Sequence, residues 1–280
     1  MGERRFAELR LASVAGLAGV ANEDYVVAGG AAFVVVDGST ARIDGGCAHG
    51  VAWYARQLGN AILGCADSPP KEALRSAIGR VAGLHSTSCD LAHPGTPAAA
   101  VLVVQVRDGV VRYALLGDVT LLVGTEDGLA VVTDDRIRRT ALAERAAADR
   151  YPIGSAEKER ALELMKWAEV RARDSADGYW IASSDPEVVE HALTGTVELD
   201  GLRCLVGLTD GATRMVETFR VTSWGGLLSI VEREGVAKLL ERTRRMEDSD
   251  PLGARWPRNK KSDDATVVHA VFGDEPVLLQ

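Results

Sequence analysis

Residues 100–116 read AVLVVQVRDGVVRYALL, two apolar runs on either side of Asp108-Gly109. Valine and leucine favour strands, and an Asp-Gly pair between such runs is typical of a two-residue hairpin, because both central residues adopt positive φ angles. The stretch therefore predicts two antiparallel strands. Further runs at 119–123 and 129–133, the latter following Asp127-Gly128, extend the prediction to a four-stranded antiparallel meander.

The rest of the chain alternates between other strand-like runs and helical patterns. Further strands are predicted near residues 25–28, 32–36, 179–183, 203–208 and 265–272, and helices near 48–63, 68–81, 156–172, 185–187 and 224–246. Antiparallel strands with helices inserted in pairs indicate an α+β sandwich rather than a doubly wound nucleotide-binding fold. The chain also contains no Gly-x-Gly-x-x-Gly or Walker-type loop, so a nucleotide phosphate cradle has no support.

Composition narrows the possible functions. The net charge of -8 argues against nonspecific nucleic-acid binding, which requires a basic face. Residues 1–6 lack the apolar core of a signal peptide, and no apolar run approaches the ~20 residues of a membrane span. The four cysteines show no Cys-x-x-Cys spacing, so neither a zinc site nor a disulfide framework is expected. These features predict a cytoplasmic protein without a membrane or nucleic-acid partner.

Seven Asp-Gly pairs occur in the chain, and two of them do not fit the hairpin pattern. Asp200-Gly201 fits it, because apolar runs lie on both sides. Asp37-Gly38, in contrast, ends the run 33–36 and leads into a polar stretch, and Asp210-Gly211 ends the run 205–208 in the same way. A carboxylate at the end of a buried strand is costly unless a cation or several hydrogen-bond donors meet it. These two pairs are therefore candidate functional residues.

Other acidic residues occupy comparable positions. Glu23-Asp24 precedes the strand that leads to Asp37, Asp118 follows a strand, and Asp263-Asp264 precedes the last strand. Carboxylates from widely separated strand ends can meet at one edge of a sandwich, where an all-oxygen cluster suits Mg²⁺ or Mn²⁺. Two such ions about 3.5–4 Å apart can align a nucleophile with a phosphoryl group. The pattern indicates a metal-assisted hydrolase.

The order of these motifs resembles that of a known family, the metal-dependent Ser/Thr protein phosphatases of type 2C, in their bacterial form. The motifs are Asn22-Glu23-Asp24, Asp37-Gly38, Asp118, Asp210-Gly211 and Asp263-Asp264. The resemblance spans about residues 13–272. It implies one phosphatase-like domain over residues 1–280, built as a four-layer α-β-β-α sandwich whose two central antiparallel sheets are flanked by helix pairs.

The resemblance also implies a role for each acidic residue. Asp37 bridges both metal ions and the Gly38 carbonyl binds the second ion. Asp210 and Asp263 complete the first ion's ligands, so that Asp37 and Asp210 form the catalytic pair.

The remaining acidic residues have outer roles by the same resemblance. Glu23 holds the second ion through water, and Asp118 is a ligand of a third, weaker site. Asp24 and Asp264 support these ligands from behind. A hydroxide that bridges two Mg²⁺ or Mn²⁺ ions would then hydrolyse phosphoserine and phosphothreonine in protein substrates, which implies a signalling enzyme.

Two departures from the family pattern leave alternatives open. Residues 16–21 contain no arginine to hold the substrate phosphate, a role for which Arg42 or Arg10 is the substitute. Ser39 stands where many members have a histidine that acts as an acid. His49, the histidine nearest in sequence to Asp37, is the candidate to replace that acid, although a histidine at a helix start often has only a structural role. The departures also fit a different class of protein, a non-catalytic phosphatase-like module that binds a partner.

Overall fold

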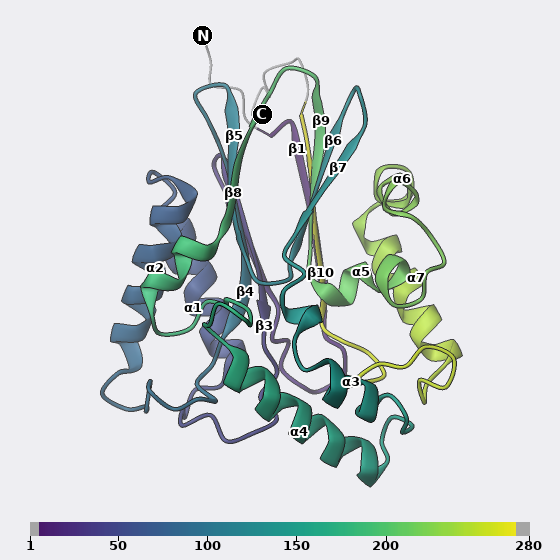
Figure 1. Cartoon of the computed structure of the whole chain (residues 1–280). Coiled ribbons are helices and arrows are strands. Elements are labelled where there is room, and N and C mark those ends of the chain that lie inside the picture. Colours follow the sequence, from purple (N-terminus) through teal and green to yellow (C-terminus); the bar gives the residue numbers. More distant parts are fainter. Residues whose placement is uncertain (1–5, 273–280) are drawn as a thin grey trace.

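The computed structural model describes residues 6–272. Residues 1–5, which make up most of the segment considered for a signal peptide, lie outside this part, as do residues 273–280. The described residues form two five-stranded antiparallel sheets that face each other, with helices on the outer side of each (Figure 1). The predicted α+β class and the α-β-β-α layering are confirmed.

The two sheets are named here by a central strand. The β3 sheet has the order β2-β3-β4-β5-β8, and the β10 sheet has the order β1-β10-β9-β6-β7. The strands of the β3 sheet are β2 (Tyr25–Gly29), β3 (Ala32–Gly38), β4 (Ala99–Arg107), β5 (Val110–Leu116) and β8 (Leu193–Glu198). Those of the β10 sheet are β1 (Glu8–Val14), β6 (Thr120–Thr125), β7 (Leu129–Thr133), β9 (Leu202–Leu208) and β10 (Ala265–Val271).

Helices cover both outer faces, and one further helix pair lies below the sheets in Figure 1. The β3 sheet is covered by α1 (Val51–Leu63) and α2 (Pro70–His85). The β10 sheet is covered by α5 (Asp210–Glu217), α6 (Trp224–Glu234) and α7 (Val236–Ser249). The lower pair, α3 (Leu142–Ala148) and α4 (Ala156–Ala172), packs through small and apolar side chains. Short 3-10 helices occur at Ile137–Arg139 and Pro186–His191.

Strand β3 shows how the core is divided between the layers. Val34 and Val36 pack against α1 and α2, whereas Phe33 and Val35 point to the other face and join the core between the sheets. Alternate residues of a strand face opposite sides, so a strand covered on both sides needs an uninterrupted apolar run. This burial explains why Asp37, the first charged residue after the run, stands out in the sequence.

The hairpin in the stretch 100–116 is confirmed, but the meander that extends it is wrong. Asp108 and Gly109 have φ angles of 54° and 79° at the turn between β4 and β5. Strands β6 and β7 also pair, yet β5 and β6 belong to different sheets. The chain crosses at Gly117, where φ is 83° and an added Cβ would lie 2.5 Å from the Ala100 Cβ. Two hairpins with the same apolar pattern do not reveal which sheet each one joins.

Asp200-Gly201 is a second such case. Gly201 has a φ of 70°, so a turn forms, but β8 and β9 on either side of it lie in different sheets. The turn is therefore a crossing between sheets and the hairpin prediction is wrong.

Several element boundaries also differ from the predictions. Residues 179–183 form only isolated bridges, and the predicted helix 224–246 is two helices separated at Gly235, where φ is 92°. The sequence analysis missed β1, β8, α3 and α5. Most residues of β1 and β8 are exposed or half-buried, so these strands carry little apolar signal.

Candidate metal-dependent active site

A cavity of about 500 Å³ lies where strands of both sheets end. The strand registers pair Gly38 with Ala99 and Leu116 with Val101, which places the ends of β3 and β5 at one edge of the β3 sheet. In the β10 sheet, the end of β9 adjoins the start of β10. Four of the predicted carboxylates line the cavity, namely Asp37, Asp118, Asp210 and Asp263.

Asp37 and Asp210 meet across the two sheets. Asp37 is the penultimate residue of β3, and Asp210 is the first residue of α5. The Asp210 backbone N–H donates a hydrogen bond of 3.1 Å to Oδ2 of Asp37. The backbone N–H at a helix N-terminus favours negative charge, so the start of α5 orients the Asp37 carboxylate.

The glycines of both Asp-Gly pairs allow close backbone approach rather than a hairpin turn. A Cβ at Gly38 would lie 2.5 Å from both the Glu23 carbonyl oxygen and Cγ1 of Val51. A Cβ at Gly211 would lie 1.9 Å from the Asp264 carbonyl oxygen. Such distances are too short for any side chain, so the pairing of Asp with Gly at these sites has a steric cause.

Asp263 lies between two cations. Its Oδ2 accepts a hydrogen bond of 2.9 Å from Arg214, and its Oδ1 lies 2.5 Å from the Lys260 ammonium. Burial acts to raise the pKa of Asp263, but the charges of Arg214 and Lys260 hold this pKa below its ordinary value. Asp263 is consequently ionised, and the positive charges of Arg214 and Lys260 balance its negative charge.

Asp37 and Asp210 have the opposite electrostatic state. Burial raises the pKa of Asp37 well above its usual value, and the nearby charge of Asp210 raises it further. Burial, followed by the charges of Asp263 and Asp118, raises the pKa of Asp210 to about 7. Ionisation of both groups thus brings mutual repulsion, and Arg214 and Lys260 offset the rise in the pKa of Asp210 only in part. A divalent cation would relieve this repulsion.

Asp118 follows β5 directly and lines the same cavity. Burial raises its pKa, and the charge of Arg138 acts against this rise. The chain passes from one sheet to the other at Gly117, and this backbone path fixes the position of Asp118. Asp118 adds a further oxygen donor to the cavity.

Asp264 and Asp24 lie behind this layer and hold the backbone. Asp264 accepts hydrogen bonds from the N–H groups of Gly16 and Glu23, at 2.7 and 2.6 Å. Asp24 accepts one of 2.8 Å from the Thr209 hydroxyl, next to Asp210. Both contacts join the segment before β2 to the residues around Asp210 and Asp263.

Glu23 lies at the margin of the site. Its carboxylate accepts a hydrogen bond of 2.6 Å from the hydroxyl of Thr40, a residue that lines the cavity. Lys260 also donates to Thr40, at 3.0 Å. Burial raises the pKa of Glu23. The position beside Thr40 suits an indirect contact with an ion, through water.

The donor set of the cavity consists of carboxylates together with the carbonyl of Gly38. Hard oxygen donors of this kind are the preferred ligands of Mg²⁺ and Mn²⁺, and a divalent ion would stabilise the ionised forms of Asp37 and Asp210. The residues therefore fit the divalent ions that the family resemblance implies.

Several cations that the sequence analysis did not identify also line the cavity. Lys166 donates a hydrogen bond of 2.8 Å to Ser39, and burial lowers the pKa of Lys166. Arg214 stands four residues after Asp210 on α5, a helical spacing that offers a local signal, whereas Lys260 stands three residues before Asp263 outside any helix. Lys166 lies in α4, far along the chain, and nothing in its neighbourhood marks it.

The three residues proposed to replace missing family side chains have different positions. Arg42 lines the cavity and makes one ion pair, at 3.2 Å, with the exposed Glu159. Arg10 lies in β1, pairs with Glu8 and lines a different hollow. Within the described residues, the lining of the acidic cavity does not include His49, which contacts Cys47 and Trp53 instead.

Of the comparisons with known proteins, the one with solved structures finds matches. Models of known protein families and curated proteins show no match to the sequence. Among solved structures, the serine/threonine phosphatase PstP/Ppp of Mycobacterium tuberculosis superposes with a TM-score of 0.57 at 16% identity, covering 95% of this chain and 98% of that chain. The fold is that of the type 2C phosphatases.

Two further structures agree with this assignment. The catalytic domain of PstP in complex with two manganese ions gives a TM-score of 0.56 at 17% identity, covering 95% of this chain and 98% of that chain. Serine-threonine phosphatase 2C from Toxoplasma gondii gives 0.56 at 14% identity, covering 95% and 94%. Identities this low establish a shared type 2C fold, and the activity has to be supported by the site itself.

Among the described residues, no helix combines the length and the apolar composition that crossing a membrane would require.

Proposed function

We propose that this protein is a metal-dependent phosphatase that hydrolyses phosphoserine and phosphothreonine in protein substrates. One observation supports the proposal most strongly. Four carboxylates from distant parts of the sequence, at 37, 118, 210 and 263, line a single cavity in a chain with the type 2C fold. A cytoplasmic location stays a prediction from the sequence.

Two divalent ions, Mg²⁺ or Mn²⁺, are the proposed cofactors, as in the structure of PstP with two manganese ions. Asp37 would help to hold both ions, Asp210 and Asp263 would hold the first, and the Gly38 carbonyl would hold the second. Glu23 would act through water and Asp118 at a third site. When bound, the ions would supply a water-derived nucleophile and positive charge beside the phosphoryl group.

The side chains of the cavity have their own tasks in this reaction. The N–H of Asp210 holds the Asp37 carboxylate in one orientation, at 3.1 Å, and Arg214 holds Asp263 at 2.9 Å. Ser39, which replaces the histidine of many family members, is fixed by Lys166 at 2.8 Å. Because the pKa of Lys166 is lowered, this ammonium group is a better proton donor than an exposed lysine, and it is placed beside the cavity.

Arg42 is the proposed contact for the substrate phosphate. It lines the cavity, and among the described residues it pairs with an exposed glutamate, so the guanidinium can exchange partners at low cost. A guanidinium can bind two phosphate oxygens at once, which favours Arg42 over the lysines for this role.

The test is hydrolysis of an aryl phosphate and of a phosphothreonine peptide by the full chain, with and without Mn²⁺. We expect Mn²⁺-stimulated turnover that Asp37→Asn abolishes. Asp108→Asn is the matched control, because it makes the same chemical change at another Asp-Gly pair, in the exposed turn between β4 and β5. A protein that binds Mn²⁺ through Asp37 yet hydrolyses neither substrate would instead support the non-catalytic partner-binding module.

A further inference from the structure

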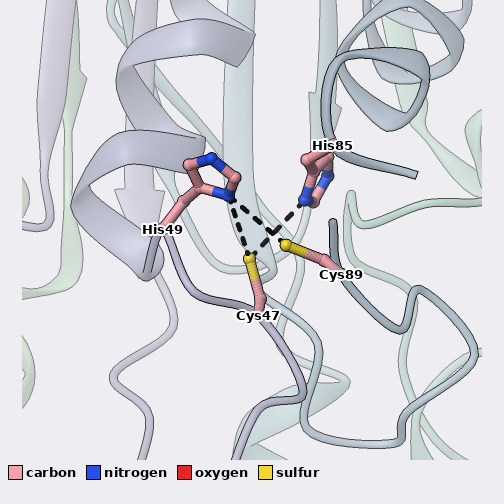
Figure 2. A group of neighbouring side chains, drawn as sticks. All are labelled: Cys47, His49, His85 and Cys89. Atoms are coloured by element: carbon pink, nitrogen blue, oxygen red, sulfur yellow. Dashed lines mark hydrogen bonds between the residues drawn. The ribbon is translucent and has the colours of Figure 1, made fainter. Parts of the chain in front are cut away.

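A second group of potential metal ligands lies at the ends of α1 and α2. Cys47 and His49 belong to the loop that joins β3 to α1, His85 is the last residue of α2, and Cys89 follows four residues later. Figure 2 shows the four side chains directed toward one another, with Nδ1 of His49 close to both sulfur atoms. This group contains two thiols and two imidazoles.

The distances match those between ligands of a tetrahedral ion. One ligand atom from each residue lies within 4.8 Å of all the others. Sγ of Cys47 is 3.8 Å from Nδ1 of His49 and 3.5 Å from Nδ1 of His85. Sγ of Cys89 is 3.3 Å from Nδ1 of His49. Zn–S and Zn–N bonds of about 2.3 and 2.0–2.1 Å in a tetrahedron separate sulfur from nitrogen by about 3.5 Å.

The two imidazole rings are held by packing. His49 stacks on Trp53, with ring centroids 4.3 Å apart and an interplanar angle of 28°. His85 is only 2% exposed, and its ring centroid lies 5.1 Å from that of Trp53. A buried imidazole such as that of His85, whose Nδ1 faces the Cys47 thiol, gains from a stronger partner than a neutral S–H group.

The loops around the cluster are held by scattered hydrogen bonds and have no apolar core of their own. Neither residues 39–50 nor residues 86–95 contain a buried side chain, and neither stretch forms a helix or a strand. They touch through the backbone, since the Asp90 N–H donates to the Gly46 carbonyl at 2.9 Å and Gly46 has a φ of 61°. Polar loops without an apolar core of their own are commonly stabilised by a metal ion or a disulfide.

The chemistry of the four residues distinguishes among possible ions. Sulfur and imidazole nitrogen are borderline-soft donors that favour Zn²⁺, whereas Mg²⁺ and Mn²⁺ favour the carboxylates of the acidic cavity. Four protein ligands leave no open position, which is typical of a structural rather than a catalytic zinc site. A disulfide between the cysteines would use only half of the cluster.

We propose that Cys47, His49, His85 and Cys89 bind one zinc ion that fastens the loop after Asp37-Gly38 to the end of α2. The ion is bound by two thiolates and two neutral imidazoles, so each thiol releases its proton on binding. The loop it braces contains Ser39, Thr40 and Arg42, which line the acidic cavity. The sequence analysis expected no zinc site, because the pattern is Cys-x-His and His-x₃-Cys rather than Cys-x-x-Cys.

The test measures bound zinc in the full chain purified without chelators. We expect one zinc per chain in the wild type, in Cys65→Ser and in Asp37→Asn, and none in the double variant Cys47→Ser/Cys89→Ser. Cys65 is the matched control, because it is a free, half-buried cysteine outside the cluster. Asp37→Asn separates this site from the acidic cavity. Equal zinc in the double variant and the wild type would overturn the proposal.

A second measurement uses only the wild type and so does not depend on the folding of a variant. After zinc removal, added Co²⁺ should produce a thiolate-to-cobalt charge-transfer band and the visible bands of tetrahedral cobalt. Zinc should also protect Cys47 and Cys89, but not Cys65, from alkylation followed by mass spectrometry. Absence of the cobalt bands, alkylation that zinc does not change, or a native disulfide between Cys47 and Cys89 would each contradict a zinc site.

Discussion

The loop of residues 39–50 connects two clusters of opposite chemistry. Asp37, just before the loop, belongs to a group of carboxylates held at the ends of buried strands. Cys47 and His49, near the end of the loop, belong to a group of sulfur and nitrogen donors at the ends of helices. Burial, and after it the repulsion between the carboxylates, raises the pKa values of Asp37 and Asp210. The difference between hard and soft donors would let the two proposed sites prefer different metal ions.

The largest expected effect separates the two clusters by activity. Asp210→Asn should lower kcat/KM for an aryl phosphate by at least about 100-fold, because it removes a ligand of the reacting ion. Its zinc content should stay at one per chain. Parallel measurement of turnover and bound zinc checks this, and loss of zinc together with activity would break the proposed division between the sites.

The next effect concerns stability. Cys47→Ser/Cys89→Ser should lower Tm by roughly 5–10 °C, because loss of a structural metal is among the most destabilising changes. Cys65→Ser should change Tm far less. Calorimetry in the presence of zinc measures both, and excess Mn²⁺ should not restore the lost stability. A double variant as stable as Cys65→Ser would show that the loops need no metal.

A smaller effect concerns pH and the acidic cavity alone. The pKa of Asp210 rises from 3.8 to about 7 on folding, so protonation favours the folded chain, and this stabilisation is lost as pH rises through 7. Mn²⁺ takes the place of the proton and should therefore raise Tm more at pH 8 than at pH 6. The difference between the two shifts should shrink in Asp210→Asn. An equal Mn²⁺ shift at both pH values would contradict this account.

The smallest effect concerns binding of the substrate phosphate. Arg42→Ala should raise KM by about 3–10-fold with little change in kcat, because a charged hydrogen bond to the substrate is lost. Arg10→Ala is the matched control, since Arg10 pairs with Glu8 away from the cavity. Steady-state kinetics with a phosphopeptide compares the two variants. Equal KM values for the two variants would assign the phosphate contact to another cation that lines the cavity, such as Lys166 or Lys260.

Comparison of particular residues shows how far sequence reasoning extends. Asp37 and Asp210 were identifiable because a charge that follows a buried strand is anomalous, and an anomaly can be seen without knowing the fold. Lys166 was not identifiable, because a lysine in a helix that is half-exposed along its length is ordinary. Cys89 was not identifiable for the same reason, since it lies in a polar loop where no local pattern is broken.

The sequence by itself determined most of the buried strands, the tight turn at Asp108-Gly109 and the order of acidic motifs, because apolar periodicity and positive-φ turns are local properties. Only the tertiary structure decided which sheet each strand joined, since β5 and β6 carry equivalent patterns but lie in different sheets. The same holds for the Cys and His cluster. Cys47 and His85 lie 38 positions apart in the sequence. Only the packing of α1 against α2 brings the two halves of the cluster together.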